Sequence, residues 1–159
     1  MNKKSITIPY IEYDSDEELN EKDIELLNAA KEATKRSYAP YSGFCVGAAL
    51  RLSNGEIISA SNQENAAYPS GLCAERVAIF FANSKYPDLA VESLAVTAAF
   101  DGNICEGPTY PCGACRQVLA ESEKRFGKRI RIITGGEKVI QIIDGISGLL
   151  PFAFDNLPR

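Results

Sequence analysis

Two short cysteine motifs constrain this chain more than any other feature, because its fold must bring them together. They are CAER at residues 73–76 and PCGACRQ at residues 111–117. The sequence contains no histidine, so a zinc site has only cysteine and carboxylate ligands to use, and imidazole-based catalysis is excluded. A structural zinc site has four protein ligands, whereas a catalytic one has three and keeps the fourth position for water. The three motif cysteines, Cys73, Cys112 and Cys115, therefore predict a catalytic zinc site.

The residues beside these cysteines predict how such a site works. Glu75 is too close to Cys73 in sequence to be an easy fourth ligand, but it can reach a water molecule on the metal, so we interpret it as the proton carrier. Three thiolates leave the zinc site formally negative, and Arg76 and Arg116 are placed to offset this by donating hydrogen bonds to the sulfurs. The chain has five cysteines; we expect Cys45 in a buried strand and Cys105 in a loop, neither with a metal role.

Length and charge limit the partners of the chain. Its 159 residues suit a single domain over residues 1–159, with residues 1–13 as an N-terminal extension. A net charge of -4 does not favour binding to a nucleic-acid backbone and fits a small, weakly charged substrate. No apolar run is long enough for a membrane span. The start of the chain shows no secretion signal, so we expect a cytoplasmic protein whose thiols stay reduced.

The pattern of helices and strands predicts an α/β domain with a mixed five-stranded sheet. An acidic run at residues 14–18 precedes a helical pattern that reaches about Ser37. Strands are expected at residues 44–52, 57–60, 94–100, 129–134 and 138–143, and further helices open at Cys73 and Cys112. A helix N-terminus lowers the pKa of a thiol, and the thiolate is the form that binds metal. Residues 77–82 are apolar all round, which indicates a helix covered by the sheet and by a further layer or subunit.

With these motifs the chain resembles the zinc-dependent cytidine deaminases, in the small homotetrameric branch with three cysteine ligands. The resemblance runs from about Ala39 to Phe154 and implies a three-layer α/β/α sandwich with one zinc ion per chain. It also implies a hydrolase that converts cytidine and 2′-deoxycytidine to uridine and 2′-deoxyuridine plus ammonia, in pyrimidine salvage. Zinc then activates water for attack on C4, and Glu75 carries the protons.

The resemblance also implies a set of substrate contacts. Asn62 and Glu64 would hold the 3′-hydroxyl of the sugar, in a segment that continues through Asn65, Ala66 and Tyr68. Phe44 would help to wall the base pocket, and the backbone amide of Ala74 would bind the pyrimidine O2. Phe154 would reach the site of a neighbouring subunit, as expected of a homotetramer with shared sites. Without the resemblance, the segment at residues 62–68 could equally be a polar surface loop, and the two phenylalanines could be ordinary core residues.

Three other functions are weighed against this one. A blasticidin-type or other nucleoside-analogue deaminase shares the zinc motifs, but the blasticidin type lacks the Asn-x-Glu-Asn segment found at residues 62–65. A non-catalytic, zinc-stabilised binding protein has no need of Glu75. A polynucleotide deaminase is disfavoured by the acidic balance and the short chain.

Overall fold

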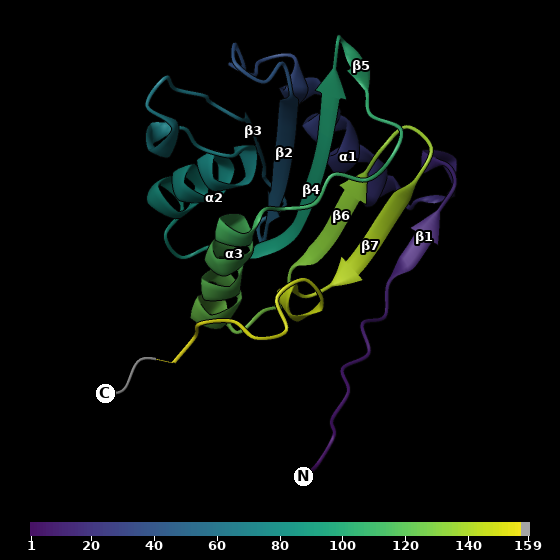
Figure 1. Cartoon of the computed structure of the whole chain (residues 1–159), viewed down its shortest axis with the longest axis vertical. Coiled ribbons are helices and arrows are strands. Elements are labelled where there is room, and N and C mark those ends of the chain that lie inside the picture. Colours follow the sequence, from purple (N-terminus) through teal and green to yellow (C-terminus); the bar gives the residue numbers. More distant parts are fainter. Residues whose placement is uncertain (157–159) are drawn as a thin grey trace.

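The computed structural model describes residues 1–156 and builds them around one mixed sheet (Figure 1). The strand order is β1-β7-β6-β4-β2-β3, with β5 paired to β4. The strands are β1 (Ile11–Tyr13), β2 (Cys45–Leu52), β3 (Ile57–Ser61), β4 (Val91–Phe100), β5 (Asn103–Ile104), β6 (Arg131–Gly135) and β7 (Ile140–Asp144). The α-helices are α1 (Glu21–Thr34), α2 (Ala74–Lys85) and α3 (Gly113–Phe126), and short 3₁₀ turns are η1 (Asp16–Glu18), η2 (Tyr68–Ser70) and η3 (Ile146–Gly148).

The five predicted strands are all present, and two more complete the sheet. Strands β4 and β6 run parallel and are joined through α3, whereas the other paired strands are antiparallel. The sequence analysis missed β1 and β5 because strands of three and two residues are too short to show an alternating pattern. Strand β1 lies in the N-terminal extension and pairs with β7, which makes it an edge of the sheet.

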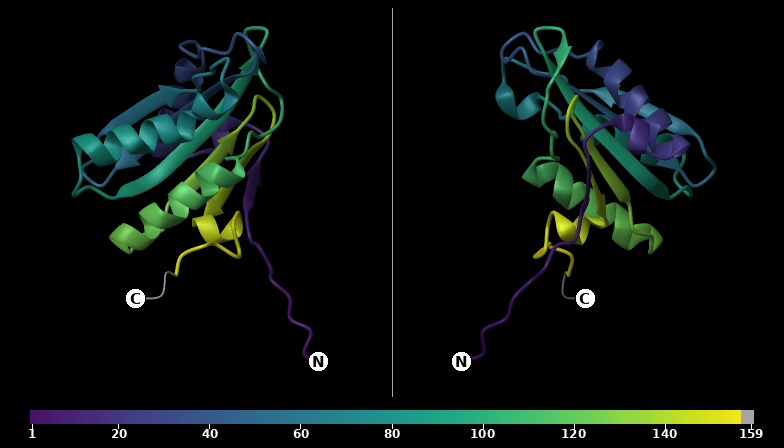
Figure 2. Two further views of the ribbon diagram at one scale, coloured as in Figure 1. Left: turned by 60° about the vertical axis from the view of Figure 1, so that its left-hand side comes forward. Right: turned by 90° about the vertical axis from the view of Figure 1, so that its right-hand side faces the viewer.

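Helices cover both faces of the sheet, which confirms the three-layer sandwich (Figure 2). On one face, Leu26, Leu27 and Ala30 of α1 pack against buried residues of the sheet such as Ala95 and Ile133. On the other face, α2 and α3 enclose a larger apolar cluster, listed here by its main members: Leu50, Leu94, Val96, Ile132, Ala78, Ile79 and Leu119. The alternation of side chains along each strand thus supplies two separate cores.

Helix α1 is shorter than its sequence pattern predicted. The acidic run forms the separate turn η1, capped by the side chain of Ser15, and α1 begins only after Asn20, whose side chain accepts from the Asp23 amide at 3.0 Å. The helix ends at Thr34 and not at Ser37. Close contact with the sheet requires Gly47 in β2, because a Cβ there would lie 2.0 Å from the carbonyl oxygen of Ala30.

The apolar stretch at residues 77–82 has two different sides in the folded chain. Ala78, Ile79 and Ala82 are buried against the sheet, as predicted. Phe80 and Phe81 are 47% and 51% exposed, so residues 1–156 cover this side of α2 only in part. None of the helices described here is both long and apolar enough to cross a membrane.

Candidate active site

The two cysteine motifs meet because each one begins a helix. Cys73 is the N-cap residue of α2 and Cys112 is the N-cap residue of α3. Both have an extended backbone, and neither side chain makes a capping hydrogen bond. Cys115 lies in the first turn of α3, on the same helix face as Cys112. Both helices lie on the same face of the sheet (Figure 1), so their N-termini can present all three sulfurs to one point.

The spacing of the sulfurs fits a tetrahedral metal ion. The Sγ atoms of Cys73 and Cys112 are 3.7 Å apart, and those of Cys112 and Cys115 are 3.5 Å apart. A zinc–sulfur bond of about 2.3 Å in tetrahedral geometry separates two sulfur ligands by about 3.8 Å. Cys73, Cys112 and Cys115 form a possible metal cluster within residues 1–156, whereas Cys45 and Cys105 stay outside it. The donor set therefore suits zinc, with the fourth position open.

Charge around the cluster favours thiolate. The pKa of the Cys73 thiol is lowered to about 5, chiefly by its hydrogen bond with Cys115 and further by Arg76, whose Nη2 donates to the Cys73 sulfur at 3.6 Å. The pKa of Cys115 is raised by the same hydrogen bond and by burial. A divalent cation held by these sulfurs favours the thiolate form of both. Arg76 thus has the charge-balancing contact that the sequence predicted.

Glu75 lies beside the cluster and is only 4% exposed. Burial is the main reason that its pKa is raised, with the negative charge of Cys73 acting in the same direction. A carboxyl group whose pKa is raised exchanges protons more readily near neutral pH than an ordinary glutamate. The position and the pKa both suit a proton carrier.

Arg116 differs from the expectation that it donates to a ligand sulfur. Its Nε donates to the carbonyl oxygen of Pro111 at 2.8 Å, and its Nη1 donates to the carbonyl oxygen of Leu149 at 2.8 Å. The sequence placed Arg116 next to Cys115, but at the start of a helix a long side chain can turn back to backbone carbonyls instead. Arg116 therefore ties the residue before Cys112 to the C-terminal segment.

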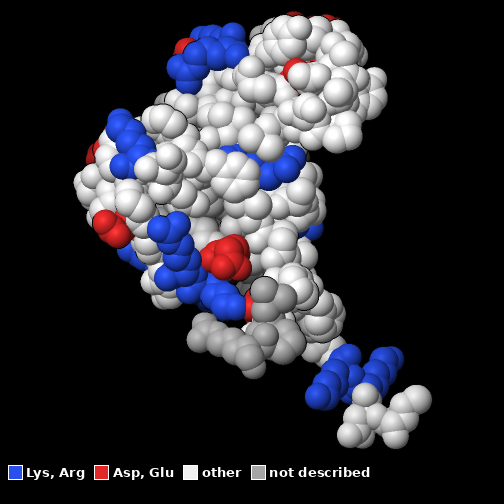
Figure 3. Space-filling model, turned by 90° about the vertical axis from the view of Figure 1, so that its left-hand side faces the viewer, with Lys and Arg blue, Asp and Glu red and all other residues white. Residues whose placement is uncertain are grey.

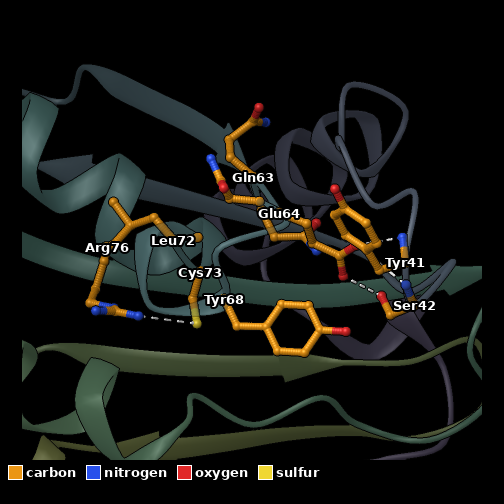
Figure 4. A pocket seen from close by; sticks show the side chains of 11 residues that line it. Tyr41, Ser42, Gln63, Glu64, Tyr68, Leu72, Cys73 and Arg76 are labelled. Carbon is orange, nitrogen blue, oxygen red and sulfur yellow. Dashed lines mark hydrogen bonds between the residues drawn. The ribbon is translucent and has the colours of Figure 1, made fainter.

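A cavity of about 470 Å³ opens next to the cluster (Figure 4). Its size is within the usual range for a small-molecule site. Several predicted site residues line it, namely Asn62, Glu64, Asn65, Tyr68, Cys73 and Arg76. Phe44, Ala66, Ala74 and Phe154 are not among the lining residues. The polar segment after β3 and one sulfur of the cluster thus share one cavity.

Glu64 is the most firmly held polar group in this cavity. Its carboxylate accepts from the backbone amides of Tyr41 and Ser42, at 2.9 and 3.3 Å, and from the Ser42 hydroxyl. The Ser42 side chain is the main cause of its lowered pKa. Figure 4 shows these contacts on one side of the cavity, with Cys73 and Arg76 on the other. Glu64 is therefore an ionised, oriented acceptor.

Asn62 is largely occupied by the backbone of β2. Its Oδ1 accepts from the amide of Val46 at 2.8 Å, and its Nδ2 donates to the carbonyl oxygen of Phe44 at 2.9 Å. An amide group has two donor hydrogens and two oxygen lone pairs, so one of each is left for a ligand. The first role of Asn62 in this structure is to hold the start of β2.

The sequence analysis missed several residues that line the cavity, chiefly Tyr41, Ser42 and Leu72. Tyr41 packs edge-on against Tyr68, with ring centroids 6.1 Å apart. A signal for the first two existed, because the segment 39–44 belongs to the resemblance, yet only its Phe44 was interpreted as a site residue. These two residues are more than twenty positions away from Glu64 in the sequence, so no local pattern reveals their contact with it.

Comparisons with known proteins agree with this fold and site. The family model for the cytidine and deoxycytidylate deaminase zinc-binding region matches residues 20–128, more than half of the chain. A cytidine deaminase of Mycobacterium tuberculosis is 34% identical over 139 residues, which cover 84% of this chain and 92% of that protein. A cytidine deaminase of Sporosarcina psychrophila is 48% identical over 100 residues, covering 62% and 69%.

Solved structures show the same likeness. The crystal structure of cytidine deaminase from Burkholderia pseudomallei has a TM-score of 0.67 and 36% identity, over 82% of this chain and 97% of that one. These matches, the three-layer fold and the cysteine cluster define a zinc-binding deaminase. The chain belongs to the cytidine and deoxycytidylate deaminase family. It is thus a zinc-dependent enzyme, and its cluster is consistent with one zinc ion per chain.

Proposed function

We propose that this protein deaminates cytidine and 2′-deoxycytidine to the corresponding uridines, with release of ammonia, in pyrimidine salvage. The observation that carries the proposal is the shared cavity, which Glu64 lines on one side and Cys73 and Arg76 line on the other. A nucleoside consists of a base, on which the deamination takes place, and a sugar, whose hydroxyl groups the enzyme can recognise. The cavity offers one end to each, since a carboxylate accepts hydrogen bonds from sugar hydroxyls.

Each group at the base end has a defined task. Cys73, Cys112 and Cys115 hold the zinc ion, which when bound activates the attacking water molecule. Glu75 accepts the proton of that water and passes it to ring N3; it then takes the proton of the new hydroxyl group on C4 and delivers it to the departing amino group, which leaves as ammonia. Arg76 offsets the negative charge of the thiolates. The amide of Ala74, at the first position of α2, has no partner among residues 1–156 and is available to the pyrimidine O2.

The working enzyme is further proposed to be a homotetramer with sites shared between subunits. Phe80 and Phe81 leave the outer side of α2 apolar, and Phe154 is 68% exposed close to α3, where its backbone bonds Gln117. The α2 side of the molecule carries mostly uncharged residues, and a hollow separates its upper lobe from the rest of the surface (Figure 3). Symmetric association is the usual way to cover such a surface, and it would bring Phe154 to a neighbour's cavity. We expect the assembly to be cytoplasmic.

An ultraviolet assay on zinc-loaded protein tests the function directly. The substrates are cytidine, 2′-deoxycytidine, cytosine, cytidine monophosphate and blasticidin S. We expect turnover of both nucleosides, loss of that turnover when zinc is chelated, and its return when zinc is restored. Free cytosine should react poorly, because it lacks the sugar hydroxyl that Glu64 is proposed to bind. Turnover of blasticidin S without turnover of cytidine would move the assignment to the nucleoside-analogue deaminases.

A further inference from the structure

The loop between β5 and α3 carries Cys112, and its first half is fixed on the turn between β6 and β7. The amide of Glu137 donates to the carbonyl oxygen of Cys105 at 2.8 Å, and that of Lys138 donates to the carbonyl oxygen of Glu106 at 3.0 Å. Gly136 permits this contact, because a Cβ there would lie 2.4 Å from the carbonyl oxygens of both Glu106 and Gly107. The loop passes this turn before it descends to α3 (Figure 1).

The second half of the loop is held by two side chains, Arg116, whose Nε donates to the carbonyl oxygen of Pro111 at 2.8 Å, and Tyr110. Within the part of the chain that the structure describes, residues 107–110 make one hydrogen bond, from the Tyr110 hydroxyl to Oε1 of Gln141 in β7. Tyr110 stands two residues before Cys112. Its hydroxyl contact therefore restrains the backbone that presents a sulfur of the cluster.

Gln141 is itself oriented by the N-terminal extension. Its Nε2 donates to Oε2 of Glu12 at 2.7 Å, and Glu12 lies directly opposite Gln141 in the pairing of β1 with β7. An ionised carboxylate only accepts hydrogen bonds, so Glu12 fixes which end of the amide faces it. The amide oxygen is then left facing Tyr110, whose hydroxyl must be the donor. Strand β1 thus determines the partner that Tyr110 meets.

We propose that Glu12, Gln141 and Tyr110 form a positioning relay that couples the N-terminal extension to the metal centre. The relay rests on the proposed assignment of Cys112 as a zinc ligand. Glu12 and Gln141 both lie outside residues 20–128, the part that matches the family's zinc-binding region. The relay gives β1 a task in this chain: by orienting one amide it keeps the Cys112 loop in its metal-binding position and slows the loss of zinc.

The rate of zinc release to a chromogenic chelator tests the relay in the zinc-loaded protein. Tyr110→Phe and Gln141→Leu should each speed release about 2- to 10-fold, the change expected from losing one hydrogen bond. Because both remove the same contact, the double variant should release zinc no faster than the faster single variant. Tyr10→Phe is the matched control, since Tyr10 is 56% exposed.

The contribution of β1 needs its own variant. Glu12→Ala should speed zinc release less than Tyr110→Phe does, and it should add nothing in the Tyr110→Phe background. Tyr110→Phe keeps the aromatic ring, so it carries the test if Gln141→Leu weakens the fold in urea unfolding. A Tyr110→Phe rate equal to that of Tyr10→Phe, or fully additive single effects, would overturn the relay. If Cys112→Ala still held zinc, the ligand assignment would fail instead, which separates the two claims.

Discussion

The sulfur cluster and the polar side of the cavity formed by residues 62–68 are neighbours, yet they are built in opposite ways. The cluster rests on two helix N-termini, and Glu75, the proposed proton carrier, is buried. The opposite side is an exposed segment after β3, in which Tyr68 is open to solvent and the half-buried Glu64 is held by another loop. The three sulfurs and Glu75 thus come from one chain, whereas the polar segment lies at the surface and leaves room for the proposed second subunit.

This difference predicts that damage to the two regions will have different signatures. A change in the cluster should remove metal and turnover together, because the sulfurs are both its structure and its chemistry. A change at the open side should leave zinc in place and alter the selection of substrate. The variants below test that separation, beginning with the largest expected effect.

Removal of any cluster sulfur should abolish zinc binding and turnover together. Cys73→Ala, Cys112→Ala and Cys115→Ala each leave two sulfurs, too few to hold the ion against water and competing thiols. Cys45→Ala and Cys105→Ala are matched controls from outside the cluster and should keep one zinc per chain. Metal analysis of the five purified variants decides the point, and loss of zinc from Cys105→Ala would indicate a closed, structural four-cysteine site.

Glu64→Ala should leave zinc in place and reduce kcat/KM for cytidine by about 10- to 100-fold, because a hydrogen bond to a charged group contributes about 1.5–3 kcal/mol. The same variant should handle 3′-deoxycytidine almost as the wild type does, since that substrate lacks the hydroxyl being recognised. Glu121→Ala, on the outer side of α3, controls for the loss of a surface charge. Equal losses on both substrates would show that residues 62–68 are scaffold.

Phe81→Asp should break the proposed assembly without emptying the metal site. A charge on the exposed side of α2 opposes burial between subunits. Light scattering should change from about four times the 17.3 kDa chain mass to a smaller species, and KM for cytidine should rise while zinc content stays constant. Asn28→Asp adds the same charge to an exposed position of α1, on the other face of the sheet, and should keep the assembly. A wild-type protein that is monomeric and fully active at nanomolar concentration would contradict the shared site.

Asn62→Ala should give the smallest effect, a loss of about 1–3 kcal/mol in the free energy of unfolding, from two hydrogen bonds of about 0.5–1.5 kcal/mol each. Urea unfolding measures it. Asn65→Ala removes only the contact with the Ala67 amide and should cost less. If Asn62→Ala kept wild-type stability but lost sugar selectivity, the residue would act on substrate more than on β2.

The contrast between the regions also explains what the sequence could predict. The clustering of the three cysteines and the place of Glu75 beside them follow from motifs of a few residues, because helix geometry fixes their spacing. The five longer strands follow from apolar runs. Contacts between distant segments leave no such pattern. Three such contacts form only in the packed fold. Arg116 turns toward Pro111 and Leu149, Ser42 donates to Glu64, and β1 pairs with β7.

The central claim is that the cysteine cluster is catalytic and that Glu75 moves its protons. Zinc content and cytidine turnover, measured together on Glu75→Gln, test it most directly. Since Glu75 serves several proton transfers, we predict one zinc per chain and a turnover lower by about 10⁴-fold, the upper end for losing a general acid–base. Turnover within about tenfold of wild type, a small fraction of that loss, would contradict the account.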